Sequence, residues 1–266
     1  MAILKDLIHS FDALWPPASA EDWDRPGLML GSAGDEITRA MLSVDITAEV
    51  IRDGLEQQCQ LLVSHHPMLL RPVHELSAES AKGHIVQAAI KGNLAIFAAH
   101  TNADVASDGV SESLAKTLGL TNLEPLDSAS GHGQIGTVQT QSLLDFSRSI
   151  AKSLPSTAGG IRVAGDPQRQ ISSVGLVAGA GDGFLNQALE SNIDLFITSD
   201  LRHHPAQDFL EASAAQGGPA LIDISHWAAE WMWLEQAKSQ LQHLQPGVEW
   251  LVSDLRTDPW DFTVMQ

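Results

Sequence analysis

The chain has 266 residues, 44% of them hydrophobic, and a formal net charge of -18. This length fits one large or two ordinary domains, and no apolar run reaches the roughly 18 residues that a membrane span requires. The strong negative charge argues against a nucleic-acid partner. The single cysteine, Cys59, excludes a disulfide framework and makes a reducing cytoplasm the expected location.

The first segment predicts an amphipathic helix over residues 1–15 rather than a signal peptide. Two prolines at residues 16–17 end this helix, and residues 21–31 are predicted as a turn-rich loop that leads into a strand. The acidic side chains of the loop could face a cation, although an exposed acidic loop is the more common structure. They are Glu21, Asp22 and Asp24.

The next part of the chain alternates short apolar strands with helices. Strands are predicted at residues 41–45, 61–63 and 94–99, with a helix in each interval. Thr47 is placed to cap the first helix, and Pro67 stops the second strand because proline cannot donate to a ladder. This order predicts a mostly parallel sheet.

Residues 121–135 are rich in turn residues and are predicted to join two lobes. After them the same order of elements recurs. The strands of this second set are predicted at residues 174–178, 194–200 and 220–225. The predicted fold class is therefore α/β, with two similar βαβαβ-based lobes at residues 1–124 and 125–266. The C-terminal segment could pack back on the first lobe.

Histidines follow the predicted strands at their carboxyl ends, where open α/β sheets place their ligands. They form four groups, which are His65 with His66, His100 with Asp104, His203 with His204, and His226 with Glu230. In the last group, a spacing of four puts the imidazole and the carboxylate on one helical face. Each group alone has an ordinary structural explanation, such as a core hydrogen bond or a turn, but together they indicate a metal site.

Five of these side chains are the predicted metal ligands: His65, His66, Asp104, His226 and Glu230. Three imidazoles and two carboxylates suit zinc, iron or manganese. Five ligands exceed the number that one tetrahedral site uses, so two divalent metal ions that share a carboxylate and a water are predicted. Such a pair activates water near neutral pH, which predicts a metal-dependent hydrolase.

The other histidines have open roles. His100 and His204 are candidate catalytic residues that transfer a proton. Together with His203, they could instead orient the metal ligands or line a pocket. The glycine-rich turn at residues 179–183 could approach a phosphate, although tight packing between strand and helix is its more common use.

These motifs resemble the NIF-three-like family, whose members are often named GTP cyclohydrolase 1 type 2 homologues. The similarity covers nearly the whole chain in the same order, at residues 62–67, 100–104, 109–110, 179–181, 198–204 and 225–230. The chain departs from the family at Arg25, Ser225 and Ala229, where asparagine, glycine and threonine are usual.

The resemblance implies a two-lobed protomer, a toroidal homo-hexamer and a dinuclear metal centre inside the ring, with the same five ligands. It also implies a hydrolase-like protein that acts on a small nucleotide-like or phosphorylated substrate, and the family name suggests opening of the GTP purine ring. The alternative is a hexamer without catalysis that binds or delivers metal ions or serves as a scaffold. Neither a nucleic acid nor a membrane is an expected partner.

Overall fold

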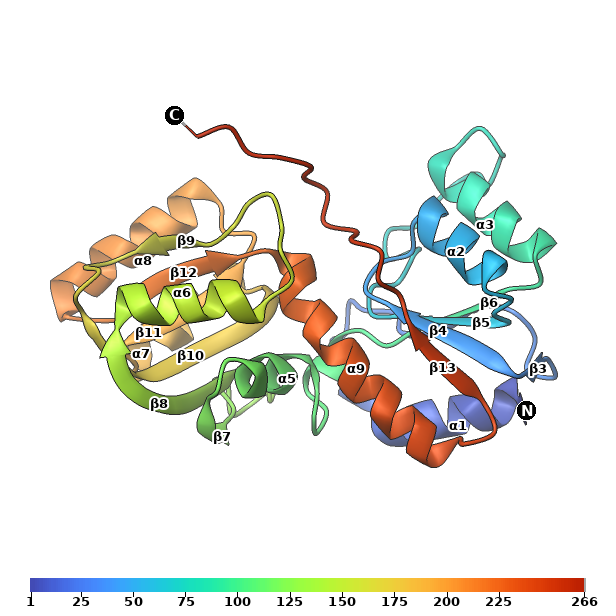
Figure 1. The fold of residues 1–266 in the computed structure, drawn as a ribbon, viewed down its shortest axis with the longest axis horizontal. Helices are drawn as coiled ribbons and strands as arrows, with labels where there is room; N and C mark the ends of the chain where they lie inside the picture. Colours follow the sequence, from blue (N-terminus) through green and yellow to red (C-terminus); the bar gives the residue numbers. More distant parts are fainter. Residues whose placement is uncertain (266) are drawn as a thin grey trace. The chain divides into compact units, whose positions relative to one another are not determined.

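The structure, a computed structural model, describes residues 1–265 as two compact units (Figure 1). Unit 1 comprises Met1–Ser107 and Leu234–Thr257, and unit 2 comprises Asp108–Trp233 and the segment that starts at Asp258. The segment after Asp108 lies before the boundary that the sequence placed at residues 124/125. It belongs to unit 2 because its helix and strand pack against the sheet of that unit.

Unit 1 is built on a five-stranded sheet in the order β13-β4-β5-β6-β2. The strands are β2 (Gly27–Leu30), β4 (Arg39–Ser43), β5 (Leu61–Ser64), β6 (Ala95–Ala98) and β13 (Glu249–Val252). The helices are α1 (Leu4–Leu14), η1 (Pro17–Ser19), α2 (Ala48–Glu56), α3 (Ala81–Lys91) and α4 (Thr101–Asp104). A separate ribbon pairs β1 (Ala2–Ile3) with β3 (Glu36–Ile37). Strands β13, β4, β5 and β6 run parallel, so the predicted mostly parallel sheet is confirmed.

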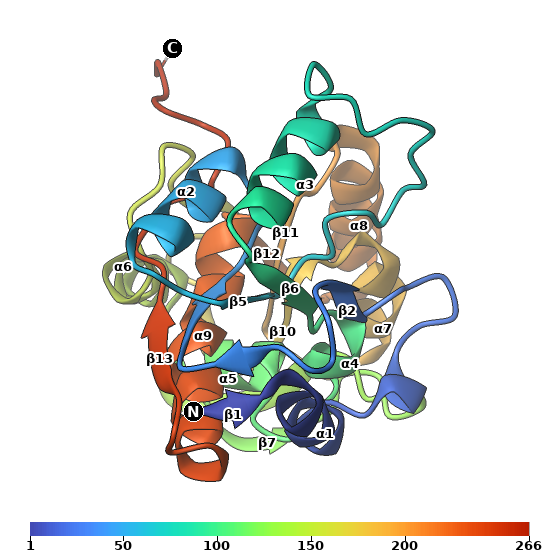
Figure 2. The same cartoon turned by 90° about the vertical axis from the view of Figure 1, so that its right-hand side faces the viewer.

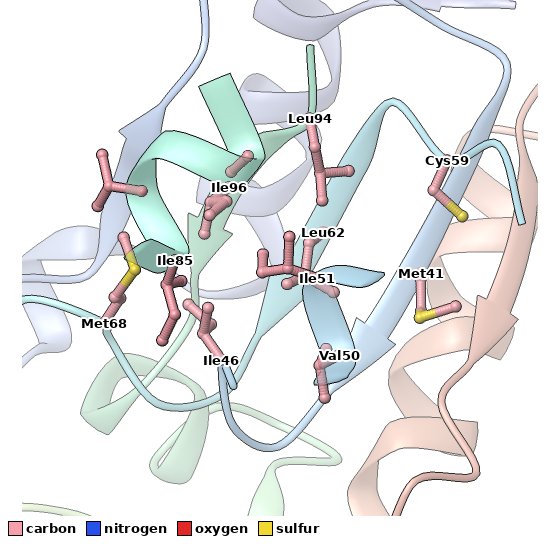
Figure 3. Close-up of a cluster of buried hydrophobic side chains, with 12 residues drawn as sticks. Met41, Ile46, Val50, Ile51, Cys59, Leu62, Met68, Ile85, Leu94 and Ile96 are labelled. Atoms are coloured by element: carbon pink, nitrogen blue, oxygen red, sulfur yellow. The ribbon is translucent and has the colours of Figure 1, made fainter. Parts of the chain in front are cut away.

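Different helices cover the two faces of this sheet, with α2 and α3 on one face and α1 on the other (Figure 2). Successive residues of a strand point to opposite faces. Met41, Leu62 and Ile96 are therefore neighbours across three strands and share one buried cluster with α2 and α3 (Figure 3). On the other face, the rings of Phe11 and Phe97 lie 4.6 Å apart, centroid to centroid.

We expect Leu62→Ala to lower the free energy of unfolding by about 2–5 kcal/mol, because it leaves a cavity in this cluster. Leu62 has no exposed surface, whereas Leu70 is 39% exposed. The matched control Leu70→Ala should stay within about 0.5 kcal/mol of the wild type. Urea denaturation of the three proteins measures both effects, and equal midpoints for all three would contradict the packing.

The start of α2 could be predicted from neighbouring residues, whereas strand β13 could not be predicted in this way. The Thr47 hydroxyl oxygen accepts a hydrogen bond from the Val50 amide at 3.2 Å, so the predicted helix cap is confirmed. No strand was expected after α9 (His226–Leu244), yet β13 pairs in parallel with β4. The division between the units falls within α9, between Trp233 and Leu234.

None of the helices that the structure describes in residues 1–265 has both the length and the apolar character that a membrane span requires.

Unit 2 contains a six-stranded sheet in the order β7-β8-β10-β11-β12-β9. The strands are β7 (Thr121–Glu124), β8 (Gln134–Ser142), β9 (Arg162–Ala164), β10 (Gln170–Ala180), β11 (Leu195–Ser199) and β12 (Ala220–Ile224). The helices are α5 (Val110–Thr117), α6 (Leu143–Ser153), η2 (Asp182–Phe184), α7 (Leu185–Glu190), α8 (His203–Gln216) and the start of α9. Strands β10, β11 and β12 are parallel, with α7 and α8 between them in sequence. The βαβαβ order of unit 1 therefore recurs, and the predicted α/β fold class is confirmed.

The prediction of a junction at residues 121–135 is wrong at both ends. Residues Thr121–Glu124 form β7, and β8 begins at Gln134. These strands pair antiparallel with each other, and their side chains are mostly exposed or only partly buried. A continuous apolar run is the signal that predicts a buried strand, and residues 121–124 and 134–142 contain no such run.

Candidate metal centre

In unit 1, the carboxyl ends of β5 and β6 bring three histidines together. His65 and His66 directly follow β5, and His100 follows β6 after one residue. The His65 amide donates to the Ser43 carbonyl at 3.0 Å, which extends the pairing with β4 beyond the strand. Ligand nitrogens of the three imidazoles all lie within 4.8 Å of one another, so this cluster could hold a metal ion.

Each imidazole of this cluster is held at Nδ1 by an oxygen atom. The distances are 2.9 Å from His65 to the Ala99 carbonyl, 2.7 Å from His66 to Asp45 Oδ1, and 2.9 Å from His100 to Asp24 Oδ1. A neutral imidazole that donates from Nδ1 carries its lone pair on Nε2, and the hydrogen bond fixes the plane of the ring. Histidines that bind metal ions are usually oriented in this way.

Asp104, on the short helix α4, lies beside one histidine of this cluster. Its Oδ1 atom lies 3.7 Å from Nε2 of His65. The helix turns the chain back after His100, whose carbonyl oxygen accepts a hydrogen bond from the Asp104 amide at 3.1 Å. The structure thus brings Asp104 to His65, and His100 lies in the same cluster although it is a predicted catalytic residue rather than a predicted ligand.

Asp24 is a site residue that sequence reasoning did not single out from its acidic loop. Asp22 is exposed, but Asp24 is only 3% exposed. Its carboxylate accepts hydrogen bonds from His100 and from both the amide and the hydroxyl of Thr101. Burial by itself would raise the pKa of Asp24, but these hydrogen bonds outweigh burial and hold the pKa well below its usual value.

We expect Asp24→Asn to lower the free energy of unfolding by about 2–3 kcal/mol at neutral pH. An asparagine amide group would point a donor at donors of Thr101 or His100. Because the pKa of Asp24 is lower in the folded state, its contribution is fully present above about pH 4 and is lost as the pH falls further.

Urea denaturation across pH 2–7 measures this effect, and the difference between wild type and Asp24→Asn should shrink below about pH 4. The control is Asp22→Asn, in the same loop but exposed. A midpoint of Asp24→Asn equal to that of the wild type at pH 7 would contradict the role of this carboxylate.

Unit 2 holds the other two predicted ligands at the start of α9. His226 is the first residue of the helix, and its Nε2 atom lies 2.8 Å from Glu230 Oε1, on one helical face as the spacing predicts. Nδ1 of His226 lies 2.7 Å from Asp200 Oδ2. Burial would lower the pKa of His226, but the charge of Glu230 and the Asp200 contact raise it to about 11. Two carboxylates around one imidazole thus favour a positive charge at this position.

The glycine-rich turn between β10 and α7 packs against the same pair. Gly179 has a φ of +80°, and a Cβ atom added to it would lie 2.5 Å from Glu230 Oε1. A Cβ atom at Gly181 would lie 2.2 Å from the hydroxyl oxygen of Thr198. Close approach of the backbone therefore explains both glycines, and Gly179 leaves the space in which the Glu230 carboxylate lies.

His203 and His204 lie in the exposed first turn of α8, with ring centroids 5.1 Å apart. Among the described residues, neither belongs to a group of three or more potential metal ligands. The catalytic role of His204 therefore stays a prediction. Sequence reasoning missed Asp45 and Asp200, whose only signal is that each follows the carboxyl end of a buried strand.

Comparisons with known proteins show what the chain is similar to. The model of the Duf34/NIF3 (NGG1p interacting factor 3) family matches residues 2–259. A Streptomyces coelicolor protein named GTP cyclohydrolase 1 type 2 homolog is 37% identical, with 98% of this chain and 94% of the relative covered. A Clostridium perfringens protein of the same name is 30% identical, with 97% and 99% covered.

Solved structures show the same fold. A Bacillus cereus protein related to NIF3 superposes with a TM-score of 0.90 at 21% identity, over 98% of this chain and 99% of the other. A Staphylococcus aureus protein superposes with a TM-score of 0.88 at 27% identity, over the same shares.

Proposed function

The chain belongs to the Duf34/NIF3 family, and on this premise we propose that it is a metal-dependent hydrolase with two divalent ions. The proposed ligands are His65, His66, Asp104, His226 and Glu230. The observation that carries the proposal is the anchoring of each of the three imidazole ligands at Nδ1. A carbonyl or carboxylate oxygen holds each ring there, which leaves a lone pair on Nε2 of His65 and His66, while the charged His226 gains one when a cation displaces its Nε2 proton.

The donor set suits a borderline divalent cation. Imidazole and carboxylate together fit zinc, iron or manganese. The carboxylates of Asp45 and Asp200 lie behind His66 and His226 and increase the basicity of these rings. Ions bound at these ligands would supply Lewis acidity and lower the pKa of water near the substrate.

His100 and His204 are the proposed proton carriers. Asp24 holds the Nδ1 proton of His100, so the Nε2 atom of this ring can accept a proton from a reacting group. His204 is exposed in the first turn of α8, where a substrate can reach it.

The proposed substrate is a small nucleotide-like or phosphorylated molecule, because curated relatives are named GTP cyclohydrolase 1 type 2 homologs. Opening of the GTP purine ring is the first reaction to test. We further propose that the protein works as a homo-hexamer in the cytoplasm. The one cysteine, Cys59, is buried in the core, which suits a chain that forms no disulfide in a reducing compartment.

Metal analysis of the purified protein, followed by a substrate screen with the metal restored, tests the proposal. We expect about two divalent ions per chain and turnover of at least one nucleotide or phosphorylated compound. A protein that binds no zinc, iron or manganese after careful reconstitution would contradict it. Two ions per chain without turnover of any compound would favour the alternative, a hexamer that binds or delivers metal ions or serves as a scaffold.

A further inference from the structure

Large apolar side chains at the end of the described chain are exposed to solvent. Trp260, Phe262 and Val264 are 67%, 79% and 76% exposed. Their spacing of two residues puts them on one side of an extended segment, since alternate residues of an extended chain face the same way. We call residues 258–265 the tail. Such an exposed row of apolar side chains is typical of an interaction surface.

The tail is nevertheless tied to its own unit. The Ser225 hydroxyl donates to Asp258 Oδ1 at 2.8 Å, and the Thr263 hydroxyl donates to the Ala158 carbonyl. Both contacts use polar groups of the tail, while the aromatic side chains of Trp260 and Phe262 face solvent. These contacts hold the tail at two points, and Figure 1 shows that it follows an extended course, which reduces the entropy that a partner would have to remove.

Unit 2 also contains a groove that matches this row. It lies between α8 and the edge strand β9 and has a volume of about 530 Å³. Its apolar walls come from the strands, the loop before α8 and the helix itself, at Val163, Leu201, Ala206, Leu210 and Leu221. A volume of this size accommodates a small ligand or about two aromatic side chains.

Charges at the rim of the groove complement the tail. Arg162 and Arg202 line the groove, and their side chains are 69% and 76% exposed. Each forms an ion pair on its own unit, with Asp223 and Asp182, but neither guanidinium is enclosed by these contacts. The tail carries acidic residues at positions 258 and 261, next to its aromatic side chains. The groove lining also includes Asp223 and Glu211, so its rim presents charges of both signs, and Arg202 is the more exposed cation that an acidic residue of the tail can reach.

Strand β9 also offers the tail a place to pair, because it lies at the edge of its sheet. This strand is the last in the six-stranded sheet and pairs with β12 on its inner side. Its outer side is thus a sheet edge, where an extended segment can add as a further strand. Alternate side chains of an added strand would then point to the α8 side of the sheet, where the groove lies.

We propose that the tail of one copy of this protein docks in the groove between α8 and β9 of a second copy, with Trp260 and Phe262 as the buried side chains. Each copy offers one tail and one groove, so the contact repeats from chain to chain and closes as a reciprocal pair or a ring. The inference does not depend on the metal centre, and a failed metal analysis would leave it intact.

Disulfide trapping tests the contact directly. Val264→Cys, which keeps Trp260 and Phe262 in place, and Ala206→Cys are prepared as separate proteins, mixed and oxidised mildly, and Cys59 contributes little background because it is buried. The expected product is a linked dimer at twice the 28.5 kDa chain mass, formed by the mixture and not by either variant alone. If a chain carrying both cysteines instead forms only an internal disulfide, the tail binds its own groove and the proposal is wrong.

Light scattering of the full chain provides an independent measurement. Trp260→Ser combined with Phe262→Ser should weaken the assembly by at least about 100-fold in dissociation constant, since both side chains are proposed as central contacts. The matched control Ile90→Ser removes an apolar side chain that is 55% exposed elsewhere and should leave the mass unchanged. Equal masses for the wild type and the tail variant at all concentrations would overturn the proposal.

Discussion

Glu230→Gln is expected to weaken the binding of zinc or manganese by at least about 100-fold while the fold stays intact. Glutamine has the shape of glutamate but lacks the charge that a divalent cation requires. Glu230 is 3% exposed, and its Oε1 atom lies 2.8 Å from His226 Nε2, so no water can easily replace the missing carboxylate. Because His226 can release its proton, the fold without metal should tolerate the change.

Titration calorimetry on the metal-free protein measures the affinity, and circular dichroism checks the fold. The matched control is Glu235→Gln on the same helix, since Glu235 is 59% exposed and pairs only loosely with Lys238 at 3.3 Å. This control should bind metal as the wild type does. Wild-type affinity in a folded Glu230→Gln protein would remove Glu230 from the proposed ligands.

Gly179→Ala is expected to displace the carboxylate of Glu230, the same proposed ligand. The added Cβ atom would lie 2.5 Å from Glu230 Oε1 and 3.4 Å from His226 Nε2. The Glu230 carboxylate can move aside, but the movement takes the oxygen away from its place beside His226. We therefore expect metal affinity to fall at least about tenfold. The left-handed φ of +80° adds a loss of about 1–2 kcal/mol in unfolding free energy.

Gly183→Ala is the matched control, because this glycine lies in the same turn with no heavy atom within 4 Å of the added Cβ. Its stability should stay within about 0.5 kcal/mol of the wild type, and its metal affinity should not change. Combining Gly179→Ala with Glu230→Asp, which shortens the side chain, should recover part of the lost affinity. A Gly179→Ala protein that binds metal normally would mean that Glu230 does not need its present position.

The two predictions probe a common design of the candidate centre. Each proposed imidazole ligand is held by an oxygen at Nδ1, and the proposed carboxylate ligands lie on helices that follow the carboxyl ends of strands, Asp104 on the short α4 and Glu230 in the first turns of the long α9. Rigid placement of this kind reduces the reorganisation that metal binding requires. It also explains why a small change, such as one added methyl group, is expected to displace the proposed ligands and lower the metal affinity.

The amino-acid sequence alone predicted the repeated βαβαβ order and the histidines that end its strands. These features are local, because an apolar run followed by a polar residue shows where a strand leaves the core. The cap at Thr47 and the shared helical face of His226 and Glu230 are equally local, and the structure contains both. Strands β7 and β8 escaped prediction because their polar, exposed residues carry no such signal.

Only the tertiary structure decided which carboxylates stand behind the histidines. Asp24 and His100 are 76 positions apart, and Asp45 is 21 positions from His66. Asp22 and Asp24 have the same charge and lie in the same loop, yet only Asp24 is buried against a histidine. Hydrophobic periodicity reports which face of a segment is buried, but it holds no information on which distant segment meets it. That partner is set by strand order and loop packing, which arise only when the whole sheet has formed.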